Sequence, residues 1–300
     1  MAILYFLEGI RNSILDALMM GITQLGGEAI MLLAALVMFW CVDKYWGYYL
    51  IGVSLLGTTL NQFMKLVFRV PRPWVLDPEF TIVEAARADA GGYSFPSGHS
   101  QSAVGTFGVI AVLARKRWVR ILSVAAAVLV PVSRMYLGVH TPLDVLVGAG
   151  TAVFLVLLLR PVGEGKHMKP MLGAMVGAAV LFYAFVVLYP FPADMDPENL
   201  AHGVKNAADL LGAVMGIAVV WIVDEKYLHF RVKASLPMQI FKVVGGICLT
   251  FLVKSLLKAP LNALFSGALL AEVVRYFLVV LTAGLGWPWM FTCVLKKKEE

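Results

Sequence analysis

The residues best suited to chemistry lie in three short segments that are far apart in the chain. These segments cover residues 65–73, 96–99 and 133–144. Their ionisable members are Lys65, Arg72, His99, Arg134, His140 and Asp144. Arg offers planar two-point hydrogen bonding to phosphate oxygens, and Lys supplies a compact positive charge. Three cations beside two histidines and one carboxylate therefore indicate chemistry on a phosphate group.

The cations and the second segment form the predicted anion site. We expect Lys65, Arg72 and Arg134 to bind phosphate oxygens. Ser97 stands where a helix N-cap belongs, and Gly98 leaves the first backbone amides open to approach. A helix N-terminus adds its dipole and its unpaired N–H groups to such a site.

The third segment predicts a histidine that is oriented by a carboxylate. His140 and Asp144 are one helical turn apart, so they lie on the same face. A carboxylate in that place holds the imidazole in one tautomer and stabilises its cation, while His99 remains to protonate a leaving oxygen. A purely structural interpretation is also open, because Thr141-Pro142 resembles an N-cap followed by N1. Asp144 would then only complement the helix dipole at N3.

The composition predicts an all-α, polytopic membrane bundle. Of 300 residues, 60% are hydrophobic and 15% are charged, whereas soluble domains carry about 25% charged residues. The apolar runs are long and do not alternate, which favours membrane helices over a barrel. The net charge of +6 lies in clusters between these runs, so it indicates no nucleic-acid partner. The three cysteines are expected to be buried free thiols.

About nine membrane helices are predicted, together with an amphipathic helix at the membrane surface over residues 3–20. The expected spans are 28–42, 46–69, 98–114, 119–138, 141–160, 170–190, 208–224, 237–258 and 270–294. The chain shows no internal repeat.

The placement of Lys and Arg predicts the orientation. Basic clusters occur at 115–120, 160–169, 226–233 and 296–298. Alternating crossings place all four clusters on one side, which the positive-inside rule assigns to the cytoplasm. The three chemical segments then lie at the non-cytoplasmic face. Short loops favour a bacterial plasma membrane.

The three segments resemble the motifs of the type 2 phosphatidic acid phosphatase superfamily, which also includes acid phosphatases and vanadium haloperoxidases. That family has K-x6-RP, then PSGH, then SR-x5-H-x3-D. This chain has K-LVFRVP-RP, PSGH and SR-MYLGV-H-TPL-D in the same order. A triple match of this kind is highly specific, and the resemblance covers about residues 25–160. It implies a catalytic core of five to six helices within residues 1–165, which include the N-terminal interfacial helix. Residues 166–300 would add membrane helices of unknown role.

The resemblance also implies a role for each site residue. His140 attacks phosphorus and forms a phosphohistidine, and Asp144 hydrogen-bonds to His140. His99 donates a proton to the leaving alkoxide and then activates water. The phosphate is bound by Lys65, Arg72, Ser97, Gly98 and Arg134. The family needs no metal and no cofactor.

The substrate prediction is a lipid phosphate monoester or pyrophosphate of the phosphatidate, sphingosine-1-phosphate or polyprenyl pyrophosphate class. Residues 25–28 are similar to a segment of sphingosine-1-phosphate phosphatases, and residues 72–77 resemble glucose-6-phosphatase, whose Lys-to-Arg gap is longer. Membrane lipids are further expected partners, and the last four helices would shape a lipid groove or a homodimer contact.

Four alternatives to a lipid phosphatase stay open. One is a sugar-phosphate phosphatase similar to glucose-6-phosphatase. A second is a non-catalytic carrier of an anion or a lipid. A third is a metal-dependent hydrolase with His99, His140 and Asp144 as ligands. The fourth is a phosphotransferase that passes the phosphoryl group to another acceptor.

Overall fold

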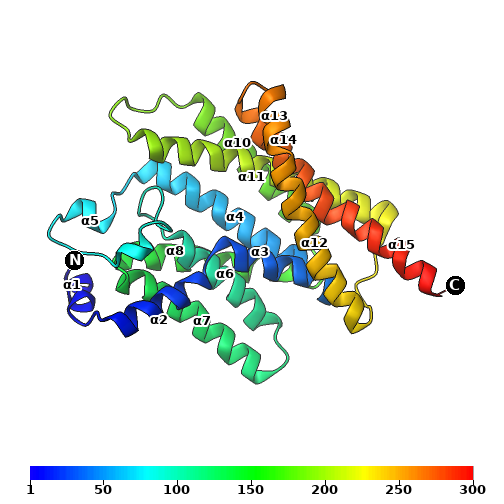
Figure 1. Ribbon diagram of the computed structural model, residues 1–300, viewed down its shortest axis with the longest axis horizontal. Coiled ribbons are helices and arrows are strands. Elements are labelled where there is room, and N and C mark those ends of the chain that lie inside the picture. The colour runs from blue at the N-terminus through cyan, green and yellow to red at the C-terminus, as the bar shows by residue number, and fades with distance from the viewer. Residues whose placement is uncertain (300) are drawn as a thin grey trace. The chain divides into compact units, whose positions relative to one another are not determined.

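The computed structural model describes residues 1–299, with side chains to residue 294, and its regular elements over that range are all helical (Figure 1). The prediction of an all-α fold is confirmed. By internal contacts the chain forms two compact units. Unit 1 comprises residues 1–34, 49–161 and 190–203, and unit 2 comprises residues 35–48, 162–189 and 204–300.

Unit 1 contains all the predicted site residues. Its helices are α1 (Ala2–Gly9), α2 (Ser13–Gln24), most of α3 (Glu28–Val37), most of α4 (Lys44–Phe68), α5 (Pro73–Leu76), η2 (Glu84–Ala86), α6 (Gly98–Leu113), α7 (Arg117–Tyr136), α8 (Pro142–Leu158) and the start of α11 (Pro197–Val223). Helix α6 packs against both α7 and α8. This three-helix group brings two of the three chemical segments together.

Unit 2 contains most of the C-terminal half. The chain passes from unit 1 to unit 2 within α9 (Arg160–Gly163). The elements of unit 2 are η1 (Met38–Val42), α10 (Met168–Leu188), the rest of α11, η3 (Asp224–Leu228), α12 (Leu236–Leu256), α13 (Lys258–Leu264), α14 (Leu269–Leu281), η4 (Thr282–Gly286) and α15 (Trp287–Glu299).

Two lysines of unit 2 have polar partners. Lys44 Nζ lies 2.7 Å from Asp224 Oδ2, and the buried Lys242 Nζ donates to backbone carbonyls, at 2.8 Å for Val232.

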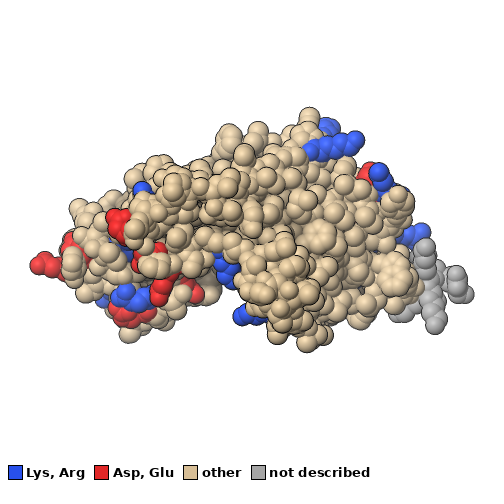
Figure 2. All heavy atoms as spheres, turned by 90° about the horizontal axis from the view of Figure 1, so that it is seen from above, with Lys and Arg blue, Asp and Glu red and all other residues tan. Residues whose placement is uncertain are grey.

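Six described helices are long and apolar enough to cross a membrane, or up to seven if the pair Ser13–Gln24 and Glu28–Val42, bent by 42°, forms one span. The predicted number of nine was therefore approximate. Helices α6 and α8 have 16 and 17 residues, fewer than the 20 or so that a straight span needs. Figure 2 shows one face on which uncharged side chains predominate and charged side chains form small groups. That surface is typical of a membrane protein.

The N-terminal prediction was wrong in one respect. The single helix over 3–20 is two helices, α1 and α2, separated at residues 10–12. Asn12 is extended and caps α2, because its Oδ1 accepts a hydrogen bond of 3.0 Å from the amide of Leu15. Arg11 leaves the helical path and donates to the carbonyls of Tyr136 at 3.0 Å and Thr81 at 2.8 Å. A local cap and a distant anchor thus override the amphipathic pattern.

The cysteine prediction was half right. All three thiols are free, but Cys248 and Cys293 are exposed and Cys41 is only partly buried. Membrane helices carry apolar side chains on their outer faces as well as inside, so apolar surroundings in sequence do not imply burial within the protein.

Gly148 allows α8 to approach the start of α6. A Cβ added at Gly148 would lie 2.5 Å from the carbonyl oxygen of Ser97. We expect Gly148→Ala to lower the free energy of unfolding by about 1–3 kcal/mol, because the backbone must move to admit the methyl group. The matched control is Gly150→Ala on the same helix, since a Cβ there meets nothing within 4 Å. Thermal unfolding in detergent measures both variants, and equal midpoints would contradict the prediction.

Candidate active site

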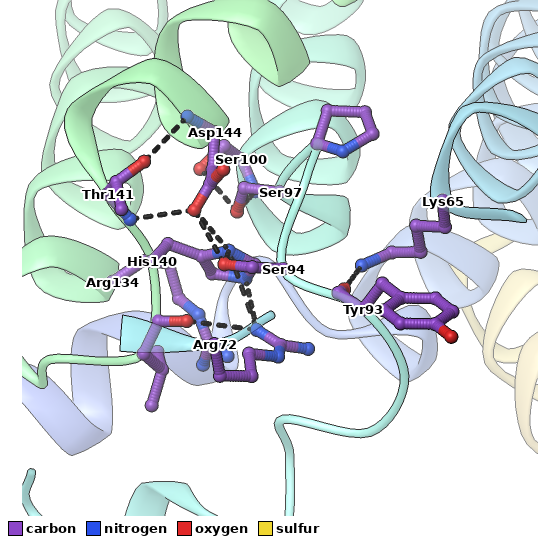
Figure 3. A network of polar contacts seen from close by, with 12 residues as sticks. Lys65, Arg72, Tyr93, Ser94, Ser97, Ser100, Arg134, His140, Thr141 and Asp144 are labelled. Carbon is purple, nitrogen blue, oxygen red and sulfur yellow. Dashed lines mark hydrogen bonds and ion pairs between the residues drawn. The ribbon is translucent and has the colours of Figure 1, made fainter. Parts of the chain in front are cut away.

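His140 and Asp144 meet at the start of α8, and both are buried (Figure 3). The side chain of Thr141 accepts from the amide of Asp144 at 3.3 Å, and Asp144 Oδ2 accepts from the amide of Thr141 at 2.7 Å. Thr141 is thus the N-cap and Pro142 the first helical residue, as the structural interpretation predicted, and the two reciprocal bonds form a capping box. The same Oδ2 also lies 3.5 Å from His140 Nδ1. Asp144 therefore caps the helix and faces the imidazole at once.

The neighbours of His140 select its tautomer. Arg72 Nη1 lies 3.0 Å from His140 Nε2 and 3.4 Å from His140 Nδ1, so its shorter contact is to Nε2. A guanidinium has only N–H donors, and its shorter contact is to Nε2, so we expect Nε2 to accept and the ring proton to lie on Nδ1. Nδ1 faces the carboxylate of Asp144. The ring thus holds its lone pair on Nε2, the nitrogen that points away from Asp144 and is free to act as a nucleophile once Arg72 turns to a substrate.

Burial lowers the pKa of His140 well below its ordinary value of 6.5, and the charges of Arg72 and Arg134 lower it further. The charges of Lys65 and of a protonated His99 also lower the pKa of His140. A nucleophilic imidazole must be neutral, so this environment keeps the group in its reactive form.

This shift predicts how activity depends on pH. Since only the neutral ring attacks, kcat/KM should not fall as the pH is lowered through 6.5, where an ordinary histidine becomes protonated. In the unfolded protein the imidazole of His140 does bind a proton below pH 6.5. The free energy of unfolding therefore decreases as the pH falls below 6.5. A pH profile of kcat/KM, with thermal unfolding measured at each pH, separates the two effects. An acid limb near pH 6.5 in a folded protein would contradict the prediction.

The three predicted phosphate-binding cations converge on one loop, residues 89–93. Arg72 donates to the carbonyls of Gly91 at 2.7 Å and Gly92 at 3.0 Å. Lys65 donates to the carbonyl of Tyr93, and Arg134 to that of Asp89 at 3.4 Å. All three side chains are buried. A phosphate group presents oxygens of the same acceptor type with more negative charge, so it can compete for these donors.

The second segment begins α6 as predicted. Ser97 is the N-cap, and its Oγ accepts from the amide of Ser100 at 3.4 Å and from the hydroxyl of Ser100 at 2.9 Å. The amide of Ser97 donates to the carbonyl of Asp144 at 2.9 Å, which ties this segment to α8. Gly98 is the first residue of α6, and His99 follows it. The structure thus brings all eight predicted site residues into unit 1.

Sequence reasoning missed several buried polar residues beside the site, among them Ser94 and Asn61. Ser94 Oγ donates to Asp144 Oδ2 at 2.6 Å. Asn61 Nδ2 donates to the carbonyl of Pro96 at 3.4 Å. Asn61 had a usable signal, because it lies one turn before Lys65 on the same helix face. Ser94 had none, since a single serine in a loop carries no periodicity.

Within the described residues, no group of three or more His, Cys, Asp or Glu side chains is placed to hold a metal ion. The alternative of a metal site formed by His99, His140 and Asp144 therefore has no assembled ligand set there. The positive charges around His140 also oppose a dication.

Comparisons with known proteins show the family of this chain. The PAP2 superfamily matches residues 46–166, and the transmembrane extension of PAP2 superfamily phosphatases matches residues 204–298. An undecaprenyl-diphosphatase of Sulfolobus acidocaldarius is 32% identical over 53% of this chain and 78% of its own length. Phosphatidylglycerophosphatase B of Bacillus subtilis is 32% identical over 52% of this chain and 78% of its own length.

A human relative aligns over more of the chain. Sphingosine-1-phosphate phosphatase 2 of Homo sapiens is 24% identical over 87% of this chain, which spans 63% of the human protein. No solved structure matches this chain.

Proposed function

Since this chain belongs to the PAP2 superfamily and is a membrane phosphatase that acts on lipid phosphates, we propose that His140 is its nucleophile and His99 its general acid and base. The observation that carries the proposal is the environment of the His140 ring. Its Nδ1 faces Asp144 at 3.5 Å, and its Nε2 faces a cation, Arg72, at 3.0 Å. A neutral, oriented imidazole beside phosphate-binding cations is suited to attack on phosphorus.

In the first step, the substrate phosphate accepts hydrogen bonds from the side chains of Lys65, Arg72 and Arg134. At the start of α6 it accepts from the hydroxyl of Ser97 and the amide of Gly98. His140 Nε2 then forms a bond to phosphorus as the P–O bond to the lipid breaks. His99 gives its proton to the leaving oxygen, and Asp144 stabilises the cationic phosphohistidine. In the second step, His99 takes a proton from water. The resulting hydroxide displaces His140 and releases inorganic phosphate.

For the substrate, we favour a long-chain lipid phosphate monoester of the sphingosine-1-phosphate type. The support is the length of the alignment with the human sphingosine-1-phosphate phosphatase, 87% of this chain, which must include part of residues 204–298. The alignments with the two microbial relatives cover only about half of the chain. In this proposal residues 1–165 carry out the chemistry, and residues 166–300 contact the hydrocarbon chain of the lipid substrate.

We also propose that the site faces the non-cytoplasmic side, in a bacterial plasma membrane. The loops from α4 to α6 and from α7 to α8 carry the site. Each is separated by one helix from the basic cluster at 115–120. Such clusters favour the cytoplasmic side.

The test is phosphate release by the purified protein on a panel of substrates, with and without EDTA. The panel contains sphingosine-1-phosphate, phosphatidate, a polyprenyl pyrophosphate and glucose-6-phosphate. We expect release from sphingosine-1-phosphate to be fastest and to be unchanged by EDTA. Faster release from the polyprenyl pyrophosphate would overturn the substrate proposal. Release from glucose-6-phosphate alone would favour the sugar-phosphate alternative. Loss of phosphate release in EDTA would favour the metal-dependent alternative.

A further inference from the structure

Ser94 lies two residues before the PSGH segment and is completely buried. Its Oγ donates to Asp144 Oδ2 at 2.6 Å and lies 3.4 Å from His140 Nδ1. Asp144 Oδ2 itself lies 3.5 Å from the same ring nitrogen. The hydroxyl of Ser94 therefore contacts both members of the His–Asp pair, as Figure 3 shows.

The protons in this triangle can be assigned. A serine hydroxyl has one hydrogen, and the short contact to a carboxylate oxygen uses it. The lone pairs of Ser94 Oγ are then free to accept from His140 Nδ1. The Nδ1–H group therefore has two acceptors at similar distances, Ser94 Oγ and Asp144 Oδ2, and the two acceptors are bonded to each other.

The backbone fixes Ser94 in this place. Its amide donates to the carbonyl of Val70 at 2.8 Å. The preceding residue, Tyr93, supplies the carbonyl that accepts from Lys65. Ser94 thus lies between a phosphate-binding cation and the nucleophile, although its own hydroxyl is directed to the His–Asp pair.

We propose that Ser94 is a positioning residue that holds the carboxylate of Asp144 and the Nδ1–H of His140 in line for the attack on phosphorus. This inference rests on the proposed function, because it needs His140 as the nucleophile. When the ring becomes a cationic phosphohistidine, its Nδ1–H group faces two acceptors, Ser94 Oγ and Asp144 Oδ2, that are hydrogen-bonded to each other. A residue that acts in this way affects the chemical step and not the binding of the substrate phosphate.

The test compares Ser94→Ala and Ser94→Cys with the wild type. Both variants weaken or remove a buried hydrogen bond to the charged carboxylate of Asp144. Loss of such a bond in the transition state predicts a fall in kcat of about 10- to 100-fold. KM should change by less than about threefold, because Ser94 does not contact the phosphate-binding donors. Single-turnover labelling should show a correspondingly slower formation of the phosphoenzyme, which a loss of folded protein alone would not produce. Ser94→Cys fills the same space with a weak donor, so it decides the question if the alanine variant fails to fold.

The matched control is Ser123→Ala. Ser123 is also buried, but its hydroxyl donates to the carbonyl of Val119 in its own helix, at 2.8 Å, away from the site. We expect this variant to keep the wild-type kcat. Wild-type kcat in Ser94→Cys, or a rise in KM with unchanged kcat, would overturn the assignment of Ser94. If a variant of His140 kept full turnover, the proposed function would fail instead, so the two failures are distinguishable.

Discussion

Replacing His140 with Asn should abolish phosphate release, with a loss of about 10⁴-fold or more, while the protein still inserts into the membrane. The variant lacks Nε2, the ring nitrogen that lies 3.0 Å from Arg72 and that attacks phosphorus in the proposed mechanism. The cations Lys65, Arg72 and Arg134 remain, so a phosphate can still bind. Release of inorganic phosphate from the preferred lipid measures the effect, and thermal unfolding in detergent checks that the protein is folded.

His167→Asn is the matched control for this experiment. His167 lies at the start of α10, outside the site, and has a positive φ of 59°, which Asn tolerates well. We expect full activity from it. Turnover by His140→Asn within a few-fold of the wild type would exclude a phosphohistidine on this residue. Binding of phosphate without turnover in the wild type would favour the carrier alternative.

The positions of the helices could be predicted because long apolar runs must form helices in a membrane. The predicted span 46–69 is α4 at Lys44–Phe68, and the span 170–190 is α10 at Met168–Leu188. The break at Ile10–Asn12 could not be predicted, because it depends on where the side chain of Arg11 finds carbonyls 70 or more residues away. Contacts of that kind leave no periodic signal in the sequence.

In the site, too, local spacing could be interpreted from the sequence but the contacts made by the folded chain could not. The spacing of His140 and Asp144 predicted a shared helix face. His140 instead precedes Thr141, the N-cap of α8, but its Nδ1 still lies 3.5 Å from the carboxylate of Asp144. The two interpretations of Asp144, as a helix cap and as a partner of histidine, were set against each other but are compatible. One carboxylate oxygen accepts from the amide of Thr141 at 2.7 Å and also faces His140. The cap fixes the carboxylate, which is what a catalytic partner needs.

The loop at residues 89–93 was not predicted to matter. Its contribution is made by backbone carbonyls, which every residue has, so the sequence Asp89-Ala90-Gly91-Gly92-Tyr93 carries no side-chain signal for it. Only the fold shows that four of these carbonyls accept from the three phosphate-binding cations. These hydrogen bonds keep the buried cations paired within the protein, which lowers the cost of burying three like charges near one another.

The second large effect is expected from His99. In the proposed mechanism this residue protonates the leaving oxygen, so His99→Gln should lower kcat on a lipid phosphate by about 10²- to 10⁴-fold. An aryl phosphate with an acidic leaving group needs little protonation, so formation of the phosphoenzyme from that substrate should be much less impaired. The second step still lacks its base, and the phosphohistidine should therefore accumulate.

Comparing the two substrates separates a general acid from a residue that only supports the fold. Rapid-quench labelling with an aryl phosphate measures phosphoenzyme formation, and steady-state release measures its hydrolysis. A structural defect would lower the turnover of both substrates by the same factor, and no labelled phosphoenzyme would accumulate. An equal loss of kcat on the lipid and the aryl phosphate would therefore contradict the role of His99. A burst of phosphoenzyme from the aryl phosphate, followed by slow release of inorganic phosphate, would support it, because His99 then fails to activate water.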